Sequence, residues 1–208
     1  MTNSPDKIQP KNGWAEPAEP RLPLPTVRER GIAFRLISGF SRFFGRPELP
    51  NVFPMLNTNR RLFWPWLFFA SRLMPFGRLS HRDRELIILR VGFNCRSRYE
   101  FAQHLEIAQR LGVSDAEILS STQAPSLCQD DKLQALYMAC DQICNKEAIS
   151  AEVWQRLSQH FDAKRLVEIL MLIGHYQMVA ALLINTKVPL EKDIEERLLR
   201  FSRSTPLP

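Results

Sequence analysis

The chain has 208 residues, a length that suits one hydrophobic core with or without an extended arm but is short for two full domains. Hydrophobic residues make up 45% of it and charged residues 24%, which excludes a disordered or fibrous protein. The formal net charge of +6 favours anionic partners. Acidic residues are interspersed among the basic ones, however, and no nucleic-acid-binding motif is present, so we expect no nucleic-acid partner.

Cysteine usage and hydropathy bear on the compartment. The four cysteines form no Cys-x-x-Cys pair and no secretory signal precedes them, so we expect a cytoplasmic protein with reduced thiols and no bound metal. Cys140 and Cys144, four residues apart on a predicted helix, are interpreted as small apolar core residues. The apolar stretch 62–69 is bracketed by arginines and too short to span a bilayer, which argues against stable membrane insertion.

The N-terminal third divides into an arm and a helix. Residues 1–30 contain six of the fifteen prolines and few large apolar side chains, so they are predicted to form a flexible arm, which could also wrap over a neighbouring subunit. Residues 31–48 contain a basic amphipathic helix over 31–45. Such a helix docks on the domain, on a second subunit or on a membrane surface.

Residues 49–208 are expected to form one helical domain. Ser80 with Asp83, and Ser114 with Glu117, have the spacing of helix N-terminal caps, and Gly112 is placed to end a helix in the left-handed conformation. No segment alternates with a period of two, so the predicted fold class is all-α. The predicted helices cover residues 58–74, 80–93, 98–111, 114–121, 131–145, 151–159, 163–185 and 191–201.

One cluster of polar residues suggests proton-transfer chemistry. Ser97, Glu100 and His104 lie at positions i, i+3 and i+7, which places them on one stripe of a helix. Glu85 lies on the preceding predicted helix, and a short turn would bring its carboxylate to that stripe. A buried carboxylate beside an imidazole can divide acid and base roles near neutral pH.

A purely structural interpretation of the same residues is also open. In it, nearby arginines neutralise both carboxylates and His104 is a satisfied interfacial histidine. The arginines concerned are Arg84 or Arg90 for Glu85, and Arg96 or Arg98 for Glu100.

The segment RDRELIILRVGFNCRSRYEFAQHLEIAQRLGVSDAEI, residues 82–118, resembles the core of the carboxymuconolactone decarboxylase family in the alkyl hydroperoxidase D superfamily. Members typically contain RELxILRV, then YEWxxH, then a glycine and a Ser-x-x-Glu cap. The segment GHYQMVAALLINTKVPLE, residues 174–191, is similar to a later family helix, and weaker similarity reaches back to about residue 50. The resemblance implies an alkyl hydroperoxidase D-like helical bundle, here with an extended N-terminal arm.

This chain departs from the redox members of the superfamily. Peroxidase relatives have a glutamate, eleven residues, a Cys-x-x-Cys, three residues and a histidine. The corresponding residues here are Glu85, Ser97, Glu100 and His104, so both thiols are missing. Because disulfide exchange needs a thiolate and a resolving thiol, the resemblance favours the decarboxylase branch over a peroxidase or thiol oxidoreductase.

The decarboxylase branch implies a cofactor-free lyase that acts on a small carboxylated lactone or keto-acid of aromatic catabolism. His104 would be the general acid, Glu100 would orient it or relay the proton, Glu85 would support the pair, and Ser97 completes the candidate catalytic set. The candidate substrate-binding residues are Arg98, Arg90, Tyr99 and His175. Relatives assemble into oligomers, so a homo-oligomer is expected, as a dimer, trimer or hexamer. A non-catalytic oligomeric binding protein on the same fold is the alternative.

Overall fold

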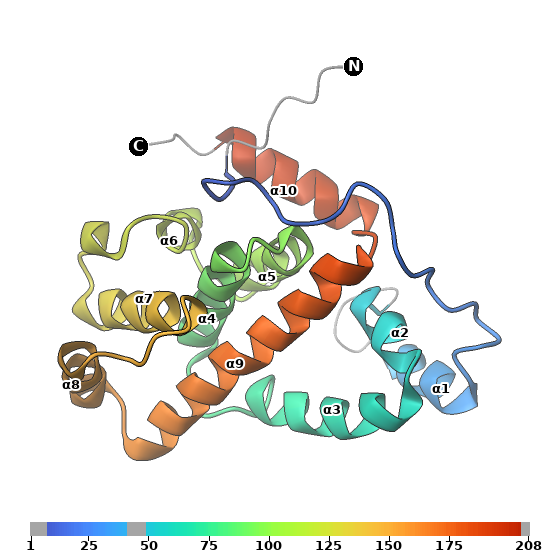
Figure 1. Ribbon diagram of the computed structural model, residues 1–208, viewed down its shortest axis with the longest axis horizontal. Helices are drawn as coiled ribbons and strands as arrows, with labels where there is room; N and C mark the ends of the chain where they lie inside the picture. The colour runs from blue at the N-terminus through green and yellow to red at the C-terminus, as the bar shows by residue number, and fades with distance from the viewer. Residues whose placement is uncertain (1–7, 41–48, 205–208) are drawn as a thin grey trace.

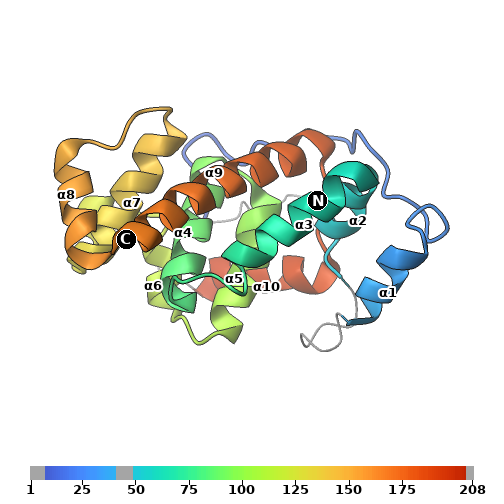
Figure 2. The ribbon, with the colours of Figure 1, turned by 90° about the horizontal axis from the view of Figure 1, so that it is seen from below.

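The computed structural model describes residues 8–40 and 49–204, and every regular element within them is helical, which confirms the predicted all-α class (Figure 1). The helices are α1 (Ile32–Phe40), α2 (Val52–Asn57), α3 (Arg60–Leu73), α4 (His81–Asn94), α5 (Arg98–Arg110), α6 (Asp115–Ser120), a 3₁₀ turn η2 (Pro125–Leu127), α7 (Asp131–Cys144), α8 (Ala151–His160), α9 (Ala163–Thr186) and α10 (Lys192–Ser204). Helices α7 and α8 lie at one end of the molecule and α1 at the other, in both ribbon views (Figure 1 and Figure 2).

Helix α4 is the centre of the core. The Ser80 hydroxyl accepts a hydrogen bond from the Asp83 amide at 3.0 Å and so caps its start, as the sequence predicted. Residues 83–92 are then all buried, because α5, α7 and α9 pack around this one helix. Charged side chains at positions 84, 85 and 90 are therefore inside the protein, where each needs a partner.

Helix α5 runs beside α4 at unusually close range. A Cβ atom on Gly92 would lie 3.3 Å from the Phe101 amide nitrogen and 3.4 Å from a carboxyl oxygen of Glu100. The missing side chain therefore lets the start of α5 approach the end of α4. This contact places the Glu100 carboxyl group directly over the α4 backbone.

Two further local predictions are confirmed at the end of α5. Gly112 has φ +83°, the left-handed conformation that ends a helix with least strain in glycine. The next helix, α6, begins with a complete capping box, in which Ser114 bonds the Glu117 amide and the Glu117 side chain bonds the Ser114 amide.

A short helix that the sequence analysis did not predict precedes α3. Helix α2 begins at Val52 and contains Pro54 in its first turn, where a missing N–H costs nothing. Helix α1 occupies the described part of the predicted 31–45 helix, and residues 41–48 lie outside the described residues. The ring of Phe34 on α1 is fully buried and packs 5.6 Å from that of Phe63 on α3.

The described part of the N-terminal arm, residues 8–30, runs across α10 and the start of α5 (Figure 1). Ile8 is buried and its amide donates to the Ser202 hydroxyl at 3.3 Å, and the Ala15 amide donates to the Arg96 carbonyl at 2.9 Å. A carboxyl oxygen of Glu16 accepts hydrogen bonds from the Arg98 and Tyr99 amides. Residues of the arm therefore complete the N-terminus of α5. The division into arm, docking helix and domain itself stays a prediction.

Candidate active site

The α4–α5 contact brings two predicted catalytic residues into direct contact. The Glu85 carboxyl group is 2.7 Å from His104 Nδ1, and neither side chain is more than 8% exposed. The other Glu85 oxygen accepts from Arg84 Nε at 3.0 Å. Because Nδ1 is engaged by a carboxylate, Nε2 is the ring nitrogen left to exchange a proton with a ligand.

Glu100 is buried and unpaired. It is 1% exposed, and neither carboxyl oxygen has a hydrogen-bond partner among the described residues. Burial raises the pKa of this carboxyl group well above its usual value, because desolvation penalises the charged form; the nearby Cys144 adds to the rise. Burial therefore favours the neutral form of Glu100, which has a proton to donate.

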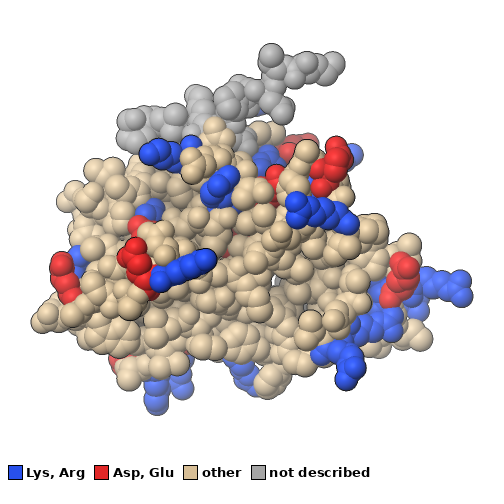
Figure 3. Space-filling view, viewed as in Figure 1, with Lys and Arg blue, Asp and Glu red and all other residues tan. Residues whose placement is uncertain are grey.

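Glu100 and His104 both line a cavity of about 530 Å³. The cavity lies between α2, α3, α5 and α9, and Figure 3 shows the surface hollowed between α9 and α3. Most of its wall is aromatic or aliphatic, which is typical of small-molecule sites. Its aromatic and imidazole side chains are Phe53, Trp66, Phe76, Tyr99, Tyr176, His81, His104 and His175.

Aromatic rings of α9 and α3 pack against the imidazole groups of this cavity. His104 packs edge-on against Tyr176, with ring centroids 5.0 Å apart, and His175 stacks on Trp66 at 5.8 Å. Burial, assisted by the charge of His104, lowers the pKa of His175 to about 4, so that ring is neutral at pH 7. The Nδ1 atom of His175 is buried without a hydrogen-bond partner in the part of the chain that the structure describes.

The predicted substrate-binding residues divide into two groups. Tyr99 and His175 line the cavity, although the Tyr99 hydroxyl is 3.1 Å from a Glu191 carboxyl oxygen. Arg90 and Arg98 do not line it. Arg90 bonds both carboxyl oxygens of Asp141 at 2.7 and 2.6 Å, and Arg98 pairs with Glu195 at 3.2 Å.

Ser97 is fully buried just before α5 and its hydroxyl has no partner, but it does not line the cavity either.

Arg84 is bonded to Glu85, one of the two pairings predicted for that carboxylate, and it also lies on the cavity. Arg84 is 2% exposed, lines the cavity and has one terminal nitrogen, Nη1, without a hydrogen-bond partner among the described residues. The only signal for it in the sequence is its position beside Glu85. Spacing alone cannot choose between Arg84 and Arg90, because both lie on a helix buried on all sides.

The cysteines lie behind the site. Cys95 and Cys144, at the ends of α4 and α7, share a hydrogen bond that raises the pKa of the first thiol and lowers that of the second. None of the four cysteines lines the cavity, and the two positions of the redox motif hold Ser97 and Glu100. Within residues 8–40 and 49–204, no group of three or more His, Cys, Asp or Glu side chains could hold a metal ion.

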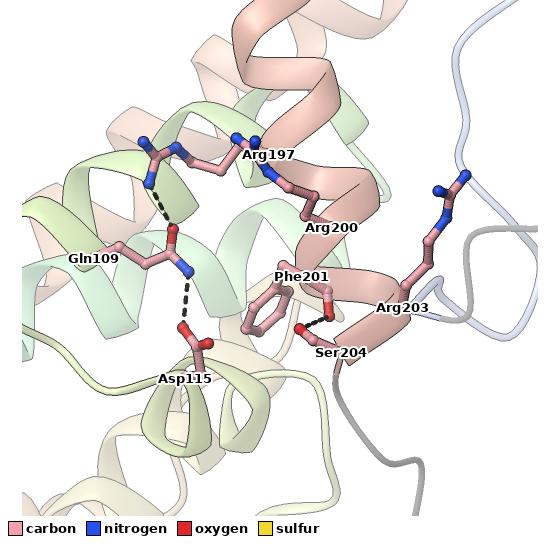
Figure 4. A pocket seen from close by; sticks show the side chains of 7 residues that line it. All are labelled: Gln109, Asp115, Arg197, Arg200, Phe201, Arg203 and Ser204. Carbon is pink, nitrogen blue, oxygen red and sulfur yellow. Dashed lines mark hydrogen bonds between the residues drawn. The ribbon is translucent and has the colours of Figure 1, made fainter.

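A second hollow, of about 610 Å³, lies where α10 crosses the end of α5 (Figure 4). Its polar groups are used locally: Gln109 donates to Asp115 at 2.7 Å and accepts from Arg197 at 3.1 Å. Figure 4 shows Arg203 directed away from the others. This hollow holds no acid–base pair, and we place the candidate site in the α2–α3–α5–α9 cavity.

Solved structures share this fold across most of the chain. A variant of the debrominase Bmp8 bound to 2,3,4-tribromopyrrole has a TM-score of 0.74 at 13% identity, covering 88% of this chain and 100% of its own. An uncharacterised peroxidase-related protein from Silicibacter sp. TM1040 has 0.75 at 15%, covering 88% and 97%. A protein of unknown function from Agrobacterium tumefaciens, whose name links it to the antioxidant defence protein AhpD, has 0.58 at 20%, covering 64% and 92%.

These likenesses define the class as the all-helical, alkyl hydroperoxidase D-like fold. The model of the carboxymuconolactone decarboxylase family matches residues 61–141, the segment from α3 to α7 that includes Glu85, Glu100 and His104. Over these residues the chain is similar to the carboxymuconolactone decarboxylase family, as the sequence predicted. No curated protein sequence matches the chain.

Proposed function

We propose that this protein is a cofactor-free, decarboxylase-like lyase that acts on a small carboxylated lactone or keto-acid. The observation that carries the proposal is the buried Glu85–His104 pair, 2.7 Å apart, at the wall of an apolar cavity that also contains the unpaired acid Glu100. An imidazole oriented by a carboxylate is the usual device for moving a proton at neutral pH.

The proposed reaction breaks the bond between the substrate carboxylate and its α-carbon. Carbon dioxide leaves, and the electron pair stays on the α-carbon, delocalised into the adjacent carbonyl as an enolate. His104, protonated at Nε2, donates that proton to the carbon and returns to the neutral ring, while Nδ1–H remains bonded to Glu85. A proton from solvent then restores the imidazolium.

Glu100 and Glu85 exchange the roles that the sequence analysis proposed. The contact to Nδ1 makes Glu85 the group that orients His104. Glu100, neutral in its buried position, is suited to donate a hydrogen bond to the enolate oxygen as charge develops there.

The alternative of a non-catalytic binding protein has less support. In a site without catalytic activity, the polar groups would tend to be paired with one another or exposed to water. Here the carboxyl oxygens of Glu100 and Nδ1 of His175 are buried and unpaired, at a cost in stability that only function explains readily. A peroxidase is disfavoured because Ser97 and Glu100 replace the two thiols.

The decisive experiment compares wild type with His104→Ala in ultraviolet-monitored turnover of a carboxymuconolactone and a panel of keto-acids. We expect turnover by wild type and a loss of at least a hundredfold in kcat for the variant, which lacks the proton donor, on the order of the contribution of general acid catalysis. Circular dichroism would show that both are folded. An active His104→Ala protein, or a wild type inactive across the panel, would contradict the proposal.

A further inference from the structure

Arg84 presents an unused positive group at the candidate site. Its guanidinium is buried, with Nε bonded to Glu85 at 3.0 Å and Nη1 unpaired. A buried donor on a charged group that lacks a partner is costly, more so than a neutral one. An anionic oxygen of a bound ligand would remove that cost, since guanidinium groups bind carboxylates with paired N–H donors.

The remaining charges around the cavity are consistent with a single deep anion site. Glu100 is the only acidic side chain among the described lining residues, and burial raises the pKa of its carboxyl group, which favours the neutral form. Arg110 and His81 are exposed, and Arg110 forms an ion pair with Glu106 at 3.3 Å. Among the described lining residues, Arg84 is therefore the one buried arginine or lysine, and the Glu85 carboxylate beside it already binds its Nε and His104.

The rest of the cavity is suited to a bulky apolar group. Phe53, Trp66 and Phe76 supply aromatic surface from α2, α3 and the segment after α3, and Tyr176 faces them from α9. A second or third carboxylate on a ligand would have to lie against this surface without a cation, which is costly. An aromatic ring would instead gain both burial and ring packing.

We propose that, within the class of the proposed function, the site prefers aromatic or similarly apolar organic acids with one anionic group, which binds Nη1 of Arg84, over small acids with several carboxylates such as a carboxymuconolactone. This inference rests on the proposed function for the location of the reacting groups. It names Arg84 as the residue that binds the anion and thereby selects the substrate. The ring of the substrate would lie toward Trp66 and Phe53.

Calorimetric titration of the full chain tests this with three probes: 2-naphthoate, the neutral 2-naphthamide, and the dianion of cis,cis-muconic acid. We expect naphthoate to bind at least tenfold more tightly than either of the other two, since a hydrogen bond to a charged group contributes about 1.5–3 kcal/mol. Equal binding of naphthoate and naphthamide would overturn the anion site. Tighter binding of muconate would overturn the aromatic preference.

The matched variants are Arg84→Met and Arg98→Met. In Arg84→Met we expect naphthoate affinity to fall to that of naphthamide, while naphthamide affinity is retained; in Arg98→Met both should be unchanged. Loss of naphthoate binding in Arg98→Met alone would contradict the assignment. If circular dichroism shows that Arg84→Met does not fold, the ratio of naphthoate to naphthamide affinity in wild type decides whether the cavity has an anion site.

Binding and turnover separate this inference from the proposed function. If naphthoate binding depends on Arg84 but the protein has no decarboxylase activity, the anion site is supported and the proposed lyase function is refuted. Turnover of a carboxymuconolactone by a protein that does not bind naphthoate would do the reverse.

Discussion

A carboxyl group that is buried without a partner has to be neutral, and this constrains what Glu100 can do. Its oxygens are buried at the cavity wall and have no hydrogen-bond partner among the described residues, so desolvation opposes ionisation there. The unfolded chain has no such constraint and ionises the same residue near pH 4.3. Glu100 therefore lowers the stability of the folded protein above that pH, as a cost of holding a protonated acid in the site.

Replacing Glu100 by Gln tests both its ionisation and its role. We expect Glu100→Gln to unfold at a higher temperature than wild type at pH 7, and the gain to disappear as the pH falls through about 4.3, where the unfolded glutamate also becomes protonated. Thermal melts at several pH values measure this, with the exposed Glu152→Gln as control. Retained turnover in Glu100→Gln would show that the group donates only a hydrogen bond, and lost turnover that it transfers its proton.

His175 gives the opposite pH dependence. Its pKa is about 4 in the folded protein and about 6.5 when unfolded, so between these values the unfolded state binds the proton that the folded state rejects. Stability is therefore lost as the pH falls from about 6.5 to about 4. We expect His175→Phe, which can still stack on Trp66, to show a smaller loss in urea unfolding over this range than wild type. His81→Gln, at an exposed position, is the control. If His175→Phe lost as much unfolding free energy as wild type over this pH range, the lowered pKa of His175 would be refuted.

The candidate site could be predicted only in part from the sequence. Helical spacing placed Glu100 and His104 on one face, and the structure puts both on the cavity. The choice of cation was not accessible, because Arg84 and Arg90 lie on a helix that is buried throughout residues 83–92. Their partners, Glu85 and Asp141, are set by how α4 packs on α5 and α7, and a pattern within one helix cannot report that packing.

At the level of elements, helix ends were predictable wherever a side chain caps them locally. The caps at Ser80 and Ser114 gave the starts of α4 and α6, since each bonds an amide three residues away. The start of α5 has a different kind of cap. Ser97 makes no side-chain cap bond, and Glu16 accepts from the first amides of the helix across 82 residues of sequence. No local pattern predicts such a contact.

Removing this distant cap should weaken α5. We expect Glu16→Ala to lower the free energy of unfolding by about 1 kcal/mol, as for loss of an N-terminal cap. Chemical denaturation measures the change, and the exposed Glu19→Ala, in the same segment, is the matched control. If both variants were as stable as wild type, the Glu16 contact would contribute nothing.

At the scale of the whole molecule, α9 has two different faces. One packs on α4, α5 and α7, and the other carries a stripe of exposed apolar side chains, Val167, Leu170, Met171 and Met178, at helical spacing. Figure 3 shows few charged side chains along this helix. The helix is also long and apolar enough to cross a membrane, with a mean hydropathy of 1.8, although its inner face belongs to the core. We propose that a second copy of the chain covers the exposed stripe.

A charge placed in the stripe should prevent that association. We expect wild type to have at least twice the monomer mass in light scattering coupled to gel filtration, and Met171→Lys, 48% exposed, to shift toward the monomer. Gln155→Lys, on the surface of α8, carries the same added charge and should stay assembled. A monomeric wild type that cosediments with lipid vesicles would instead point to a membrane surface as the partner of α9.

The Glu16 contact also has a consequence for the order in which the protein folds. Glu16 leaves the ribosome long before Arg98 has been synthesised, so its carboxyl group has no amide to bind until the chain has closed a loop of 82 residues. Closing such a loop carries an entropy cost that pairing of the consecutive helices α4 and α5 does not share. We therefore expect α4 and α5 to pair before residues 8–30 dock, so that the N-terminus of the helix carrying His104 is completed late.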